Sequence, residues 1–226
     1  MNKNKKIINL FSKTFPSSNF YQKSRIDNFY CQNQKDCRVN LAKEATYTPY
    51  LGDVNTSVMV IAEAPSVTCG KGAYIGGSFS DLEVTNKSPI HIVRDFCQKN
   101  FNTIPYFTDL VKCGIEKQQN KKLLNIRYKN CIEHFLLKEI QIIEPEYILC
   151  IGKTSYDFMV EYKKNGKIKE PIKIFNLLHY SRRAMLPLSD KDKIDLVWKI
   201  QTGIIGKGDL FKISIGELSY FKSYKF

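Results

Sequence analysis

Two short, unbroken apolar runs restrict the possible folds of this chain more than any other feature. They occupy residues 58–62 and 147–151, and each has the length of a single strand. A strand that is apolar along its whole length suits a parallel sheet, because helices cover such a sheet on both faces. The runs therefore predict an α/β protein in which both segments lie at the centre of the sheet.

Further strands and helices alternate with these runs along the chain. Residues 106–109 form a short aromatic and β-branched segment, and residues 172–178 form another expected strand. Helices are expected from Pro89 onward, from about 123 to 143, and from 154 to 162. The alternation predicts a three-layer αβα sandwich around a central, mostly parallel sheet.

One domain with terminal additions is the simplest organisation for a chain of 226 residues. We expect the αβα domain to span residues 31–189 and to be monomeric. A basic and aromatic extension, residues 1–30, precedes it. A C-terminal extension, residues 190–226, is expected to pack on the same domain.

The charge balance indicates the partner. Thirty-five Lys and Arg residues stand against 22 Asp and Glu residues, which gives a net charge of +13. Such an excess is typical of proteins that bind a polyanion, and DNA is the first expectation. A general bias of the source genome toward Lys and Asn is the alternative explanation.

Neither a secretory signal nor a membrane span is expected. Residues 1–10 lack a small-residue cleavage site, and nowhere does the chain approach the ~18 continuous apolar residues of a span. A cytoplasmic location without a membrane partner is therefore predicted. In a reducing compartment, the seven cysteines are expected to be ligands or core residues rather than disulfides.

Four short segments carry the residue types of a catalytic site. Residues 62–66 follow the first apolar run, and a glycine-rich loop with Phe79 comes after them. The segment 106–113 ends its strand at Asp109, and His179 follows the last expected strand. Because parallel sheets bind ligands at the carboxyl ends of their strands, these segments are expected to meet there.

In this order the segments resemble the uracil-DNA glycosylase superfamily, and within it the iron–sulfur branch often called family 4. The resemblance covers about residues 31–185. It implies an enzyme that flips a base out of DNA and hydrolyses its glycosidic bond. By this resemblance Glu63 positions the attacking water or stabilises the sugar cation, and His179 stabilises charge on the departing base.

The resemblance also implies residues that bind the base and the DNA. The base would lie against Phe79, Asp109, Ala64 and Gly77. The DNA contacts would come from Ser66, Ser181, Arg182, Arg183 and Lys112. The alternatives are that Phe79 packs on the core, that His179 is structural, and that the two arginines form a solvated turn.

Four cysteines match the ligand positions of the resembled branch, which implies a [4Fe–4S] cluster. They are Cys31, Cys37, Cys113 and Cys131, and a polar loop is expected between the first two. Four thiolates can also bind zinc, so a structural zinc ion is one alternative and ordinary core cysteines are another. We interpret Cys69, Cys97 and Cys150 as structural.

Asp109 stands where the resembled branch has the Asn that binds the uracil edge. An ionised carboxylate only accepts hydrogen bonds, so it repels O4 of uracil but accepts from the N4 amino group of cytosine. This change predicts a modified cytosine as substrate, for example in phage DNA. The alternatives are a conventional uracil glycosylase in base excision repair, with Asp109 protonated or displaced, and a non-catalytic iron–sulfur module that binds nucleic acid. Asp109 could also simply cap a turn.

Overall fold

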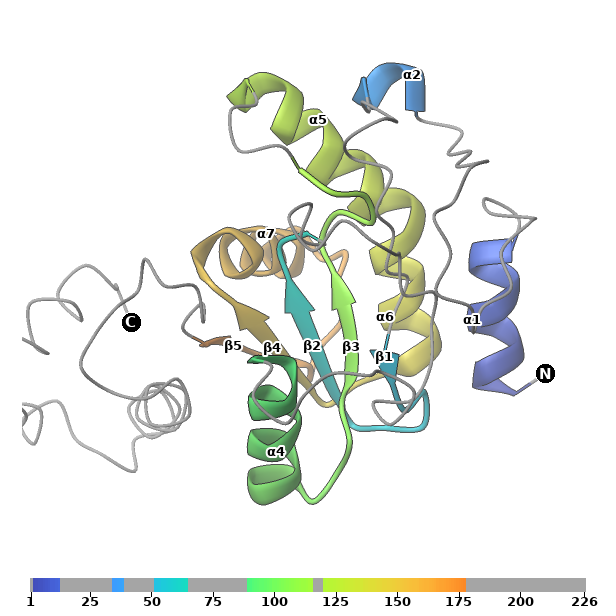
Figure 1. Ribbon diagram of the computed structural model, residues 1–226, viewed down its shortest axis with the longest axis vertical. Coiled ribbons are helices and arrows are strands. Elements are labelled where there is room, and N and C mark those ends of the chain that lie inside the picture. The colour runs from blue at the N-terminus through green and yellow to red at the C-terminus, as the bar shows by residue number, and fades with distance from the viewer. Residues whose placement is uncertain (1, 13–33, 39–50, 65–88, 116–119, 178–226) are drawn as a thin grey trace, which may run out of the picture.

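The computed structural model describes residues 2–12, 34–38, 51–64, 89–115 and 120–177 (Figure 1). Most of the expected N-terminal extension and all of the C-terminal extension lie outside these residues, so the proposed domain boundaries stay predictions. Within the described residues, no helix is both long and apolar enough to cross a membrane.

Five strands form one sheet in the order β1-β3-β2-β4-β5. Their bounds are β1 (Leu51–Gly52), β2 (Val58–Ala62), β3 (Tyr106–Asp109), β4 (Tyr147–Ile151) and β5 (Lys173–Leu177). The last four are mutually parallel, and only the two-residue β1 pairs antiparallel, at the β3 edge. Every residue of β2 and β3 is buried. The predicted, mostly parallel sheet with buried central strands is confirmed.

The described helices largely follow the expected periodicity. They are α1 (Lys3–Ser12), α2 (Gln34–Cys37), α4 (Pro89–Phe101), α5 (Lys121–Cys131), the π-helical η1 (Ile132–Leu136), α6 (Leu137–Ile143) and α7 (Lys153–Lys164). Helix α4 begins at Pro89, as predicted. The single helix expected over 123–143 is instead two α-helices joined by the π-helical η1. Part of the polar loop expected before Cys37 is the short helix α2.

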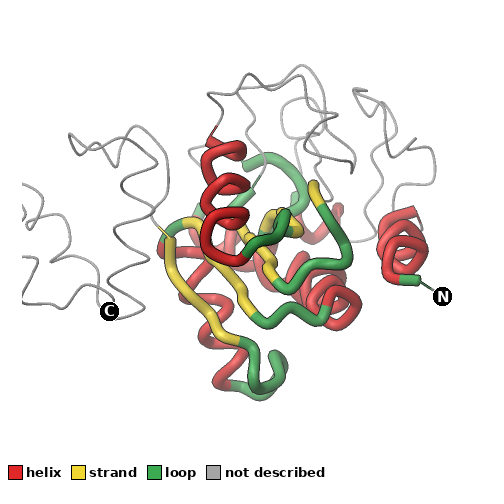
Figure 2. The backbone as a smooth tube through the Cα atoms, turned by 90° about the horizontal axis from the view of Figure 1, so that it is seen from below, coloured by secondary structure: helices red, strands yellow, loops and turns green. Residues whose placement is uncertain are grey.

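Helices cover both faces of the sheet, so the described residues form the predicted three layers. Successive strand residues point to opposite faces, and β2 shows the consequence. Met59 and Ile61 belong to a core with α1, α5, η1, α6 and α7, whereas Val58 and Val60 pack with α4. Figure 2 shows α1 at the edge of the molecule that carries the N-terminus. There the Lys3 ammonium donates to the Ile143 carbonyl at the end of α6.

The backbone pairing of β2 and β3 continues past the ends of both strands. Ala62 and Asp109 are register partners. Beyond them the Leu110 N–H donates to the Ala62 carbonyl at 2.8 Å, and the Val111 N–H donates to the Glu63 carbonyl at 3.0 Å. The segments that follow the two central strands are therefore held side by side.

Candidate active site

Glu63 and Asp109 come together at the carboxyl edge of the sheet. Asp109 is the last residue of β3, and Glu63 directly follows β2. The continued pairing of the two strands fixes the backbone of both residues. Ala64, half-buried, follows Glu63 and packs on the core. Three of the residues predicted from the sequence are thus brought to one edge, where parallel sheets bind their ligands.

Tyr128 of α5 donates a hydrogen bond from its hydroxyl to Oε1 of the half-buried Glu63. The tyrosine is itself buried, and burial and the neighbouring Glu63 both raise its pKa. The phenol therefore stays protonated and acts as a donor at neutral pH. Sequence reasoning missed this residue, and the one signal it had was that a buried tyrosine hydroxyl needs a hydrogen-bond partner.

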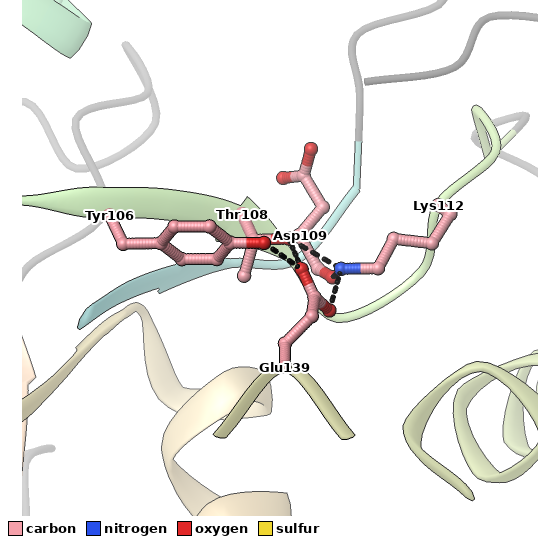
Figure 3. A network of polar contacts seen from close by, with 5 residues as sticks. All are labelled: Tyr106, Thr108, Asp109, Lys112 and Glu139. Atoms are coloured by element: carbon pink, nitrogen blue, oxygen red, sulfur yellow. Dashed lines mark hydrogen bonds and ion pairs between the residues drawn. The ribbon is translucent and has the colours of Figure 1, made fainter. Parts of the chain in front are cut away.

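Asp109 is a buried residue, 4% exposed. Desolvation raises its pKa to about 7, with the Lys112 charge opposing the shift and the Glu139 charge adding to it. The side-chain carboxyl points away from the Lys112–Glu139 pair (Figure 3). Near neutral pH both the neutral acid and the carboxylate are therefore populated at this position.

A buried polar network surrounds the backbone of Asp109 (Figure 3). The Glu139 carboxylate of α6 accepts from the Tyr106 hydroxyl at 2.7 Å and from the Thr108 hydroxyl at 2.9 Å. The Lys112 ammonium lies 2.6 Å from Oε2 of Glu139. It also donates to the Asp109 carbonyl at 2.8 Å and to the Thr108 hydroxyl. The network thus ties the end of β3 to α6.

The structure corrects the role predicted for Lys112. Its side chain is 2% exposed, and its ammonium binds acceptors inside the protein. The prediction that Lys112 contacts DNA is therefore wrong. Sequence reasoning also missed Glu139. The only sequence signal was a charged residue beside apolar positions such as Ile140. This signal does not indicate which residue the Glu139 carboxylate contacts.

The cysteine region lies where α2 meets α5. The Arg127 guanidinium is 1% exposed and donates to the Cys37 carbonyl at 2.7 Å and to the Arg38 carbonyl at 2.9 Å. The Asn130 amide nitrogen lies 3.3 Å from the Cys37 sulfur. Cys131 follows Asn130 on the same helix, so two of the four predicted ligands belong to contacting elements.

The described cysteines alone do not form a metal site. Cys37, Cys113 and Cys131 are all buried. Among the described residues, however, no three His, Cys, Asp or Glu side chains lie close enough together to hold a metal ion. The cluster and its zinc alternative therefore stay predictions. Cys97 and Cys150 are fully buried, and burial raises the pKa of both thiols, which agrees with their interpretation as structural residues.

Several predicted residues lie outside the described part of the chain, and their roles stay predictions. The catalytic one is His179, and the base-binding ones are Phe79 and Gly77. The remainder are the predicted DNA contacts Ser66, Ser181, Arg182 and Arg183 and the predicted ligand Cys31.

Comparison with known families finds a match over most of the chain. Residues 49–200, well over half of the chain, match the family described as the uracil DNA glycosylase superfamily. No curated protein was found to match the chain. The matched region contains β1–β5 of the described sheet, and both Glu63 and Asp109 fall within it.

Proposed function

Since the chain belongs to the uracil DNA glycosylase superfamily, we propose that it is a DNA glycosylase that excises a flipped pyrimidine base. The enzyme hydrolyses the N-glycosidic bond and leaves an abasic site. Support comes from the placement of two carboxyl side chains, Glu63 and Asp109, at the carboxyl edge of a parallel sheet. The net charge of +13 suits the DNA partner.

Glu63 is the proposed catalytic carboxylate. Bond breaking leaves positive charge on the sugar and negative charge on the departing base, so a carboxylate beside the sugar can position water or stabilise the cation. The hydrogen bond from Tyr128 orients this carboxylate. We assign stabilisation of the departing base to His179, with Phe79 as the ring on which the base stacks.

A modified cytosine is the proposed substrate, and the observation that carries this assignment is the buried Asp109 carboxyl. The neutral acid donates to N3 of cytosine through its hydroxyl and accepts from the N4 amino group through its carbonyl. The ionised carboxylate keeps only the contact with the N4 amino group. An unmatched polar group in a buried pocket costs about 1–3 kcal/mol, which is enough to decide between two bases. Phage DNA is the proposed source of the modified base.

Uracil is the second candidate, favoured by the pKa of Asp109, which is raised to about 7. A neutral carboxylic acid offers one donor and one acceptor, as an Asn amide does. It can donate to O4 of uracil and accept from N3–H. The ionised carboxylate cannot donate to O4. Uracil excision therefore requires the protonated form of Asp109.

We also propose a structural [4Fe–4S] cluster, with zinc as the alternative. Cys31, Cys37, Cys113 and Cys131 would hold it, and its contribution would be to fix the surrounding chain rather than to take part in base excision. Arg127 and Asn130, which contact Cys37, would support the ligand-bearing segment. A monomeric, cytoplasmic enzyme is part of the same proposal.

Single-turnover formation of abasic sites tests the function. Matched oligonucleotides would carry uracil, cytosine, hydroxymethylcytosine or glucosylated cytosine, and the enzyme would be wild type or Asp109→Asn. We expect the wild type to cleave the modified cytosine series and the variant to shift toward uracil. Cleavage of uracil by both proteins alike would contradict the substrate assignment. Tight DNA binding without cleavage of any base would instead support a non-catalytic binding module.

A further inference from the structure

Tyr128 holds Glu63 by a hydrogen bond that joins two layers of the fold. The hydroxyl belongs to α5, and its acceptor, Oε1 of Glu63, follows the central strand β2. The tyrosine ring packs at a tilt against Phe158 of α7, with a centroid separation of 5.0 Å. This ring contact helps to hold the hydroxyl oxygen beside Glu63.

Helix α5 has its own anchor one residue before Tyr128. The buried Arg127 guanidinium donates to two backbone carbonyls, those of Cys37 and Arg38. An arginine with its charge buried against two carbonyls holds a helix in one position, because any displacement leaves charged donors unpaired. The helix that carries Tyr128 is therefore held in place beside Glu63.

We propose that Tyr128 is a positioning residue for Glu63, and this inference rests on the glycosylase function proposed above. The phenol occupies Oε1 and so leaves Oε2 as the oxygen that faces the reacting water or sugar. Tyr128 does not act as an acid itself, since burial and Glu63 keep its hydroxyl protonated.

The test is single-turnover excision by Tyr128→Phe, with the maximal rate and the affinity for DNA measured separately. The substitution keeps the packed ring and removes only the hydroxyl. We expect the maximal rate to fall about 10- to 100-fold, the range for loss of a hydrogen bond to a charged group. The affinity for uncleaved DNA should stay at the wild-type value, because the lost hydroxyl contacts Glu63. A purely structural role would instead lower stability and DNA affinity together with the rate.

Tyr162→Phe is the matched control. Tyr162 of α7 is also buried and also hydrogen-bonds a glutamate, Glu133, which is exposed and takes no part in the proposed site. Its variant should keep the wild-type rate and DNA affinity. An unchanged rate for Tyr128→Phe, or an equal loss in both variants, would overturn the positioning role while the enzyme remains active. An inactive wild type would overturn the glycosylase function as well.

A double-mutant cycle and a modified side chain give independent tests. In a Glu63→Ala background, which removes the acceptor, Tyr128→Phe should have no further effect on the rate, because the interaction is already lost. Fully additive effects would contradict the proposal. Fluorotyrosine at position 128 keeps both ring and hydroxyl but makes the phenol a stronger donor. It should keep most of the wild-type rate, unlike Tyr128→Phe, and a loss as large as that of Tyr128→Phe would count against the proposal.

Discussion

The ammonium of Lys112 lies 2.6 Å from the carboxylate of Glu139, and their side chains are 2% and 0% exposed. The two residues come from different layers: Lys112 follows β3, and Glu139 belongs to α6. The same ammonium holds the Asp109 carbonyl. A buried ion pair therefore fixes the backbone of the residue that we propose reads the base.

Lys112→Met should destabilise the protein by about 3–5 kcal/mol, because it leaves the Glu139 charge buried without its partner. The double variant Lys112→Met/Glu139→Leu should recover part of this loss, since no buried charge then remains. Urea unfolding of the wild type, Lys112→Met, Glu139→Leu and the double variant measures the free energies that this comparison needs. If the double variant loses the sum of the two single effects, the pair is not coupled as described.

Lys153 and Asp157 provide the control for this pair. Their N–O distance is the same, 2.6 Å, but the side chains are 71% and 54% exposed. Solvent screens such a pair, so Lys153→Met should change the free energy of unfolding by less than about 0.5 kcal/mol. A similar loss at both positions would show that burial does not set the strength of these pairs.

Asp109→Asn should remove the part of the free energy of unfolding that changes with pH through the Asp109 carboxyl. The pKa of Asp109 is about 7 in the folded protein against an ordinary value of 3.8, so the folded state binds more protons between these values. The stability of the wild type should therefore fall as the pH rises from about 4 to about 7. The variant lacks this fall and should be the more stable protein at pH 8, by about 1–4 kcal/mol. Denaturant unfolding at pH 4, 6 and 8 checks the trend, and a constant difference would contradict it.

The fold was largely predictable because its signals are local. The apolar runs 58–62 and 147–151 are the central strands β2 and β4, and α4 begins at Pro89. The π-helical η1 was not predictable, because the apolar residues around it also fit one continuous helix. Its hydrogen-bond pattern depends on how α5 and α6 pack against the rest of the fold.

The candidate site was predictable only where its residues follow strands. Glu63 and Asp109 were placed correctly at the sheet edge, because strand ends can be located from apolar runs. Lys112 was assigned to the surface, where most lysines lie. Its burial depends on Glu139, which is far away in sequence. Tyr128 was missed for the same reason, since its partner Glu63 is brought to it by the fold.

Arg127→Met should destabilise the protein by about 2–4 kcal/mol. The substitution removes charged donors from two carbonyls, those of Cys37 and Arg38, while keeping much of the side-chain volume. Arg94→Met is the control, because Arg94 bonds the exposed Asp95 at the surface. It should change stability by less than about 0.5 kcal/mol. Equal losses in the two variants would show that Arg127 does not anchor α2 on α5.

The choice between bases should depend on pH through Asp109. Only the neutral acid can donate to O4 of uracil, and its population falls about tenfold between pH 6 and pH 8 for a pKa of about 7. Wild-type excision of uracil should fall in proportion. Excision of hydroxymethylcytosine should fall less, because the carboxylate still accepts from the N4 amino group.

Single-turnover rates on both substrates at pH 6, 7 and 8 measure the ratio of uracil excision to hydroxymethylcytosine excision. Asp109→Asn cannot ionise, so its ratio should stay constant over this range and should favour uracil. A wild-type ratio that does not change with pH would mean that Asp109 does not read the base. A ratio that changes equally in wild type and variant would mean that another group titrates, because asparagine cannot gain or lose the proton that Asp109 does.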